Sequence, residues 1–140
     1  MKKFFSLALG LILLASCSSD DSSNSIDTSK LTNKKWIPVS TEVFGMTIPY
    51  EHENIQCGKD YEMFETGGVL KTVYYDFDCS EDIYLETWKL EGNKITTIED
   101  GVIIVGTIVK LDATSLVVSA EVDVNEDGKD ETLELTYSSN

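Results

Sequence analysis

The chain has 140 residues, with 25 acidic and 11 basic side chains and a formal net charge of −14 at pH 7. All of the basic side chains are lysines, and the sequence contains no arginine. Proteins that bind nucleic acid neutralise phosphates with Lys and Arg clusters, so this composition excludes nucleic acid as an expected partner. It also argues against electrostatic attachment to an anionic membrane surface.

The N-terminus has the organisation of a secretion signal. Residues 1–3 supply positive charge, and residues 4–15 form an apolar run. That run is too short to span a hydrocarbon core of about 30 Å but suits a signal peptide. Leu14-Ala15-Ser16, directly before Cys17, resembles the lipobox of bacterial lipoproteins. The resemblance implies that residues 1–16 are removed and that Cys17 carries acyl chains such as palmitate; the alternative is an ordinary secretory signal with a chance cysteine.

Residues 17–32 are rich in Ser, Asp and Asn, and we expect them to form a flexible tether after the lipidated cysteine. Asp20-Asp21 resembles the surface-export signal of Bacteroidota lipoproteins. Two or more acyl chains anchor a protein stably, at about 0.8 kcal/mol per buried CH₂. We therefore expect lipid anchoring in the cell envelope, at the outer membrane, with exposure at the cell surface favoured.

Cys57 and Cys79 are left once Cys17 is assigned to lipid. An exported chain most simply joins such a pair in a disulfide, which would stabilise the fold by about 3 kcal/mol. Two free buried thiols or a metal pair are the competing interpretations. His52 is the only histidine, so a zinc site has few ligands to draw on.

The region 33–140 is predicted to be one all-β domain. Stretches rich in β-branched and aromatic residues alternate with Gly, Asn and Asp turns at intervals of roughly 8–12 residues, which is typical of a sandwich or barrel. The short turns favour antiparallel pairing of neighbours. A short helix near residues 51–55 is kept as an alternative to an irregular segment. Eight strands are expected, near residues 35–44, 60–65, 69–77, 83–90, 94–98, 102–111, 116–122 and 132–137.

Alternation along 116–122 and 132–137 predicts one core face and one solvent face. The stretch 102–111 is apolar on both faces. It is expected to be either covered on both sides or bent at Gly106.

Several local motifs mark this region: Lys35-Trp36, Val39-Ser40, Cys57, Cys79, Thr87-Trp88-Lys89-Leu90, Gly92-Asn93-Lys94-Ile95 and Asp127-Gly128-Lys129. Together with the strand and turn order, these motifs resemble the lipocalin-like domain of many small Bacteroidota lipoproteins over residues 31–137. Two departures are the missing glycine before Trp36 and Glu86 in place of a glycine before Thr87-Trp88. The resemblance implies an eight-stranded antiparallel up-and-down barrel and a small apolar or amphipathic ligand.

Aromatic side chains are the candidates for lining such a cavity, and the alternative is that they form the core. If Trp88 and Leu90 point inward, the period of two places Tyr84 and Glu86 inward as well. Glu86 is then either a polar contact for a ligand or a hydrated carboxylate at the barrel mouth. The expected ligand-binding residues are Tyr75, Tyr84, Glu86 and Trp88, from the wider aromatic set Tyr61, Phe64, Tyr75, Phe77, Tyr84, Trp88 and Tyr137.

Residues 123–134 fit the calcium-loop pattern D-x-[DN]-x-[DN]-G-x₅-E. The flanking segments alternate as strands, and Asp130 stands where an apolar residue normally holds the loop. We therefore favour a charged hairpin tip over a Ca²⁺ site, and expect no other cofactor. The candidate ligands are Asp123, Asn125, Asp127 and Glu134, with the carbonyl of Lys129.

No catalytic constellation is evident, because His52 lies in a polar stretch and no Ser or Cys has a recognisable nucleophile context. We expect a membrane-anchored, monomeric binding protein rather than an enzyme. The rival hypothesis is a surface interaction or structural lipoprotein whose filled barrel, stabilised by calcium in one version, presents loops to a protein or glycan partner.

Overall fold

The computed structural model describes residues 26–139. The signal peptide, Cys17 and Asp20-Asp21 lie outside this range. The helix and strands that it contains are α1 (Thr28–Leu31), β1 (Ile37–Val43), β2 (Met46–Pro49), β3 (Tyr61–Glu65), β4 (Val69–Tyr75), β5 (Glu81–Glu91), β6 (Lys94–Glu99), β7 (Val102–Leu111), β8 (Ser115–Val122) and β9 (Glu131–Ser138).

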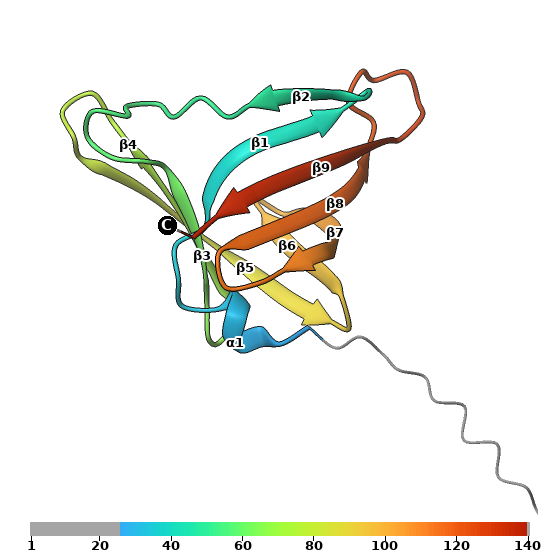
Figure 1. Ribbon diagram of the computed structural model, residues 1–140, viewed down its shortest axis with the longest axis horizontal. Helices are drawn as coiled ribbons and strands as arrows, with labels where there is room; N and C mark the ends of the chain where they lie inside the picture. Colours follow the sequence, from blue (N-terminus) through green and yellow to red (C-terminus); the bar gives the residue numbers. More distant parts are fainter. Residues whose placement is uncertain (1–25, 140) are drawn as a thin grey trace, which may run out of the picture.

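The nine strands form a single sheet in the order β2-β1-β9-β8-β7-β6-β5-β4-β3 (Figure 1). Each strand from β3 to β8 pairs antiparallel with the next strand along the chain, and β9 pairs antiparallel with β1. The all-β, antiparallel, up-and-down arrangement predicted from the sequence is confirmed.

The sheet is rolled, but it is not a closed barrel. Its two edge strands, β2 and β3, are not paired with each other. At one end the roll is nearly shut, because Trp36, just before β1, forms an antiparallel bridge with Glu62, and Thr32 bridges to Phe64. The structure is therefore an incomplete barrel. Its edges are bridged at one end, here called the seamed end, and are separate at the other end.

The prediction of eight strands is wrong by one, because β2 was not foreseen. Residues 46–49 pair with β1 through a tight turn at Phe44-Gly45, where both residues have positive φ values of 54° and 70°. All of β2 is exposed, so it lacks the alternation that marks a half-buried strand. The short helix considered near residues 51–55 does not form, since residues 53–57 are turns.

The core lies at the seamed end of the roll, next to α1 (Figure 1). Leu31 and Trp36 are fully buried there, and the indole Nε1 of Trp36 donates a 2.8 Å hydrogen bond to the Leu31 carbonyl. Residues 26–32, expected as part of the flexible tether, thus belong to the folded domain. No helix within residues 26–139 is long and apolar enough to cross a membrane.

Strand β7 excludes one of the two sequence interpretations of residues 102–111, namely that both of its faces are covered. Ile103 is 65% exposed and Val105 is 51% exposed, so the strand is not covered on both faces. Gly106 faces β8 at close range, where an added Cβ would lie 2.5 Å from a methyl carbon of Val118. The ladder irregularity lies between Ile108 and Lys110 instead of at Gly106.

Candidate functional site

The concave face of the sheet carries acidic groups in two neighbouring rows of side chains. Glu62 of β3 pairs with Thr72 of β4, which pairs in turn with Tyr84 of β5. In the neighbouring row, Leu70 pairs with Glu86. Because side chains two apart share a face, these rows place two carboxylates and a phenol on the interior side of β3 and β5, which flank β4.

A partly enclosed cavity of about 340 Å³ lies above the core on this concave face. This volume is near the lower end of the roughly 300–1,000 Å³ typical of small-molecule sites. Core side chains including Phe64, Leu70 and Ile95 form its floor. An adjoining hollow of about 220 Å³ shares Glu62 with the cavity, as well as Thr72, Tyr74 and Glu99.

Glu62 is the most perturbed acid in the cavity wall. Its Oε1 accepts a 3.2 Å hydrogen bond from the hydroxyl of Tyr137 on β9. The pKa of the Glu62 carboxyl is raised from 4.5 to about 7, chiefly by burial and to a smaller extent by the charges of Glu99 and Glu86, while the hydrogen bond from Tyr137 acts in the opposite direction. The side chain is half-buried, because protein surrounds it while the cavity still admits water.

Glu86 and Glu99 complete an acidic wall made by β3, β5 and β6. Burial raises the pKa of Glu86, and the negative charges of Glu99 and Asp100 add to the shift. The pKa of Tyr74, which lines both hollows, is also raised by burial and then by the charges of Glu62 and other interior acids. The carboxylates are therefore close enough to destabilise one another's ionised forms.

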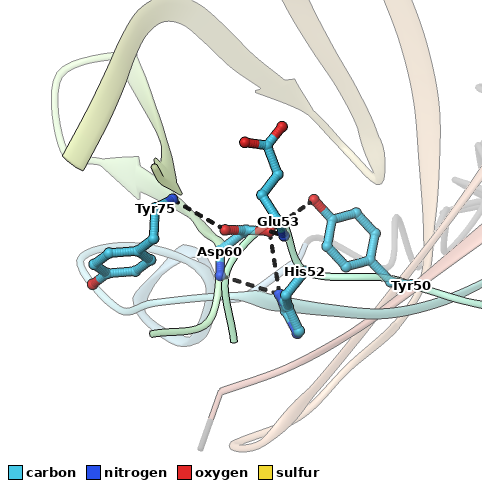
Figure 2. A network of polar contacts seen from close by, with 5 residues as sticks. All are labelled: Tyr50, His52, Glu53, Asp60 and Tyr75. Atoms are coloured by element: carbon cyan, nitrogen blue, oxygen red, sulfur yellow. Dashed lines mark hydrogen bonds and ion pairs between the residues drawn. The ribbon is translucent and has the colours of Figure 1, made fainter. Parts of the chain in front are cut away.

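Asp60 anchors the rim of the cavity near its opening, and Figure 2 shows its contacts. The side chain is 1% exposed. Its Oδ2 accepts hydrogen bonds from the Glu53 backbone N–H at 3.0 Å and the Tyr50 hydroxyl at 3.3 Å, and its Oδ1 accepts one from the Tyr75 N–H at 3.3 Å. These bonds tie the β2–β3 connection to the start of β3 and the end of β4.

His52 contributes to the same network. Its Nδ1 lies 3.1 Å from the Asp60 backbone nitrogen and 3.4 Å from Asp60 Oδ2. One nitrogen cannot both accept from the first and donate to the second, and the shorter contact has the required N–H geometry. We therefore assign Nδ1 as an acceptor in a neutral ring. In this arrangement the imidazole is a structural partner of the loop.

The predicted Cys57–Cys79 disulfide is present. It joins the β2–β3 connection to the β4–β5 turn, and the side-chain amide of Asn54 strengthens the link with a 2.9 Å hydrogen bond to the carbonyl of Asp76. The bridge and the Asp60 network therefore both hold the β2–β3 connection against β4 and the turn that follows it.

The predicted ligand-binding residues do not all reach the interior. Tyr84 and Glu86 line the smaller hollow. Trp88 lies deeper, where it packs edge-on against Phe64 and its Nε1 donates to the Glu65 carbonyl at 3.1 Å. Tyr75 lines neither hollow; its ring lies against Gly58 on the other face of β4.

The wider aromatic set divides in the same way. Phe64 and Tyr137 belong to both the core and the cavity wall. Tyr61 is buried and also contributes to the wall. Phe77 is 93% exposed on the β4–β5 turn, so its expected interior position is wrong.

The candidate calcium loop forms the β8–β9 turn. The side chains of Asp123, Asn125 and Asp127 accept hydrogen bonds from backbone N–H groups of the turn. Glu134 lies opposite Ser119, three residues inside β9 and so about 10 Å along the strand from the loop. No group of three or more His, Cys, Asp or Glu side chains within residues 26–139 has an arrangement that could hold a metal ion.

Several interior residues were not predicted as site residues: Asp60, Glu62, Tyr74 and Glu99. Alternation alone would pair Glu62 with the apolar Phe64 on the concave face. The sequence signal that could have identified Glu62 was a carboxylate on the same face of the strand as an apolar side chain. For Glu99, which directly precedes a turn, no local signal distinguishes an interior acid from a turn residue.

Comparisons of the sequence with protein-family models and with curated proteins find no match. Solved structures do match the fold. A lipocalin-like protein from Bacteroides uniformis ATCC 8492 aligns with a TM-score of 0.57 at 12% identity, over 79% of this chain and 99% of that chain. The bovine lipocalin allergen Bos d 2 aligns at 0.50 and 14% identity, over 82% of this chain and 76% of that one.

Apocrustacyanin C1 aligns with a TM-score of 0.51 at 15% identity, over 84% of this chain and 71% of that chain. Identities this low establish likeness of fold alone. The chain therefore has a lipocalin-like, all-β fold: a single antiparallel sheet rolled around an interior cavity.

Proposed function

We propose that this protein binds a small amphipathic ligand inside its rolled sheet. The observation that carries the proposal is the cavity of about 340 Å³, which has an apolar floor and a few convergent polar groups. Interior binding is consistent with a lipocalin-like fold, although fold likeness alone is a weak warrant for function. A barrel of this size can equally be filled by its own side chains. The observed cavity is therefore evidence for ligand binding that the fold alone does not provide.

The arrangement of the two ends favours binding over a purely structural role. Leu31, Trp36 and the core around them fill one end of the roll. Towards the other end, the Asp60 network and the disulfide fix the rim without filling the space. A preformed, braced cavity spares a ligand the cost of ordering the site. We propose a binding role and no catalytic one.

The sequence further supports attachment to the membrane. We propose that Cys17 carries acyl chains and anchors the domain to the outer membrane, with residues 18–25 between the lipid and the folded part. Mass spectrometry of the membrane-extracted protein should show an acylated N-terminal cysteine. Recovery of an unmodified chain that begins elsewhere would contradict the anchor and leave the binding proposal standing.

Titration with N-phenyl-1-naphthylamine, a neutral probe whose fluorescence rises in apolar surroundings, tests the binding proposal. We expect saturable binding of one probe per chain, reversed by decanol. Fluorescence that stays at the buffer value across the titration, with no small molecule extracted from freshly purified protein, would contradict the proposal.

The rival role, a surface for a macromolecular partner, has one observation in its favour. Ile98 of β6 pairs with Ile103 of β7 on the convex face, and both are exposed at 42% and 65%. Neighbouring Val105 extends this apolar strip. If Ile103→Lys abolished function in the cell while probe binding was unchanged, the rival role would be favoured.

A further inference from the structure

The polar groups of the interior carry one sign of charge. Glu62, Glu86 and Glu99 line the two hollows, each from a different strand. No lysine or histidine among residues 26–139 lines either hollow, and the full sequence contains no arginine. Within the described residues, no positively charged side chain therefore lies beside these carboxylates in the two hollows.

These carboxylates also keep free acceptor atoms, in contrast to Asp60. Both oxygens of Asp60 are taken by hydrogen bonds from the loop and β4. Glu62 uses only Oε1, towards Tyr137, and Glu99 uses only Oε1, towards the Thr97 hydroxyl at 3.3 Å. Within the described part of the chain, no protein group donates a hydrogen bond to the Glu86 carboxylate. At least one oxygen of each acid is free to accept a hydrogen bond from a ligand.

Three strands beyond the acids in the sheet contribute apolar side chains to the cavity. Ile104 of β7, Val118 and Ala120 of β8, and Leu135 of β9 line the larger cavity. The acids come from β3, β5 and β6, and the apolar side chains come from β7, β8 and β9, which follow β6 in the sheet. A ligand that satisfies both sets of side chains must have a cationic group at one side and an apolar body at the other.

We propose that the ligand of this cavity is a cationic amphiphile, with an ammonium group held by Glu62, Glu86 and Glu99 and an apolar body against Ile104, Val118 and Leu135. This inference rests on the proposed function and narrows its ligand class. The cavity volume limits the body to a short chain or a single ring system, since it lies near the lower end of known small-molecule sites.

The state of Glu62 gives the complex a pH signature. The groups that face it are Glu86, Glu99, Tyr74 and Tyr137, all acidic or neutral. With a pKa of about 7, Glu62 is largely protonated at pH 6 and largely ionised at pH 8. Binding of an ammonium group should therefore strengthen from pH 6 to pH 8 and displace protons from the protein.

Three probes with the same ten-carbon chain test the ligand class: decylammonium, decanol and decanoate. Each is titrated by calorimetry into the full-length protein at pH 8 and pH 6, below its micellar concentration. We expect decylammonium to bind about tenfold or more tightly than decanol at pH 8, as a charge-assisted hydrogen bond allows. Decanoate should bind more weakly than decanol.

A matched pair of variants locates the cationic group. Glu86→Gln should reduce decylammonium affinity about tenfold at pH 8 and leave decanol affinity unchanged. Glu65→Gln is the control, because Glu65 lies on β3 next to Phe64 but lines neither hollow. Melting temperatures recorded for both variants show whether either change acts through folding.

The outcomes distinguish failure of the proposal that the ligand is cationic from failure of the proposal that the cavity binds a ligand at all. If decanol and decanoate bind as tightly as decylammonium, the cationic class is overturned while ligand binding stands. If none of the three probes binds, both fail. Equal losses of decylammonium affinity in Glu86→Gln and Glu65→Gln would also overturn the site, because surface charge alone would then explain the preference.

Discussion

The hydroxyl of Tyr137 donates a 3.2 Å hydrogen bond to Oε1 of Glu62 from a position 75 residues later in the sequence. Tyr137 is 8% exposed and belongs to the core cluster, whereas Glu62 lines the cavity. The bond therefore connects the packed end of the roll to its acidic wall. It also favours the ionised form of Glu62 in a position where burial and neighbouring acids oppose ionisation.

Glu62 should make the protein less stable as the pH rises. Its folded pKa of about 7 lies above the ordinary value of 4.5, so the folded state binds more protons than the unfolded state between these pH values. Its contribution to stability is complete below about pH 4.5 and is lost as the pH rises through 7. The loss is on the order of 2 kcal/mol, allowing for partial exposure to water.

Glu62→Gln isolates this contribution. Urea unfolding of the wild type and the variant should give a stability difference that grows in the variant's favour from pH 4.5 to pH 7.5 and then levels off. The comparison removes the other acids, which are common to both proteins. A difference that stayed constant across this range would show that the pKa of Glu62 is not raised.

Replacing Asp60 by Asn should weaken the braced rim. The amide can present its oxygen to the Tyr50 hydroxyl and the Glu53 N–H, but its NH₂ then faces the Tyr75 N–H and leaves that donor unpaired. We expect a loss of about 1–3 kcal/mol in the free energy of unfolding. Hydrogen exchange of the Glu53 and Tyr75 amides should also accelerate.

Asp82→Asn is the control for Asp60→Asn, since Asp82 is exposed on β5. Its stability should stay within about 0.5 kcal/mol of the wild type. If Asp60→Asn behaved like this control, the hydrogen bonds in Figure 2 would not be bracing the rim.

Leu31→Ala tests whether the segment before β1 belongs to the domain. Leu31 is fully buried against Trp36 and the core, so truncation should lower the free energy of unfolding by about 2–5 kcal/mol. Lys30→Ala, at the neighbouring exposed position of α1, should change stability little. Equal, small effects at both positions would show that this segment belongs to the flexible tether and not to the folded domain.

The sequence predicted those features that depend on local patterns. The alternation through Trp88 and Leu90 placed Tyr84 and Glu86 on the interior face, and the structure has both lining a hollow. The antiparallel order followed from short turns between β-rich stretches. The Cys57–Cys79 disulfide followed from pairing the two cysteines left in an exported chain.

Features that depend on distant parts of the chain were missed. Leu31 is a single apolar residue in a polar tract, and only the pocket beside Trp36 makes it a core residue. Strand β2 is exposed throughout, so hydrogen bonding to β1 defines it and periodicity does not. Glu62 and Glu99 meet Glu86 only because three strands align in one curved sheet, and local sequence does not encode that register.

Binding of N-phenyl-1-naphthylamine to Thr97→Phe and Thr96→Phe tests interior ligand binding most directly. Thr97 lines the cavity, whereas Thr96 is its neighbour on β6 and points to the opposite face. The same substitution at adjacent positions therefore fills the cavity in one variant and leaves it open in the other. We predict that Thr97→Phe abolishes saturable binding and that Thr96→Phe retains wild-type affinity; equal affinity in both would contradict a ligand site inside the sheet.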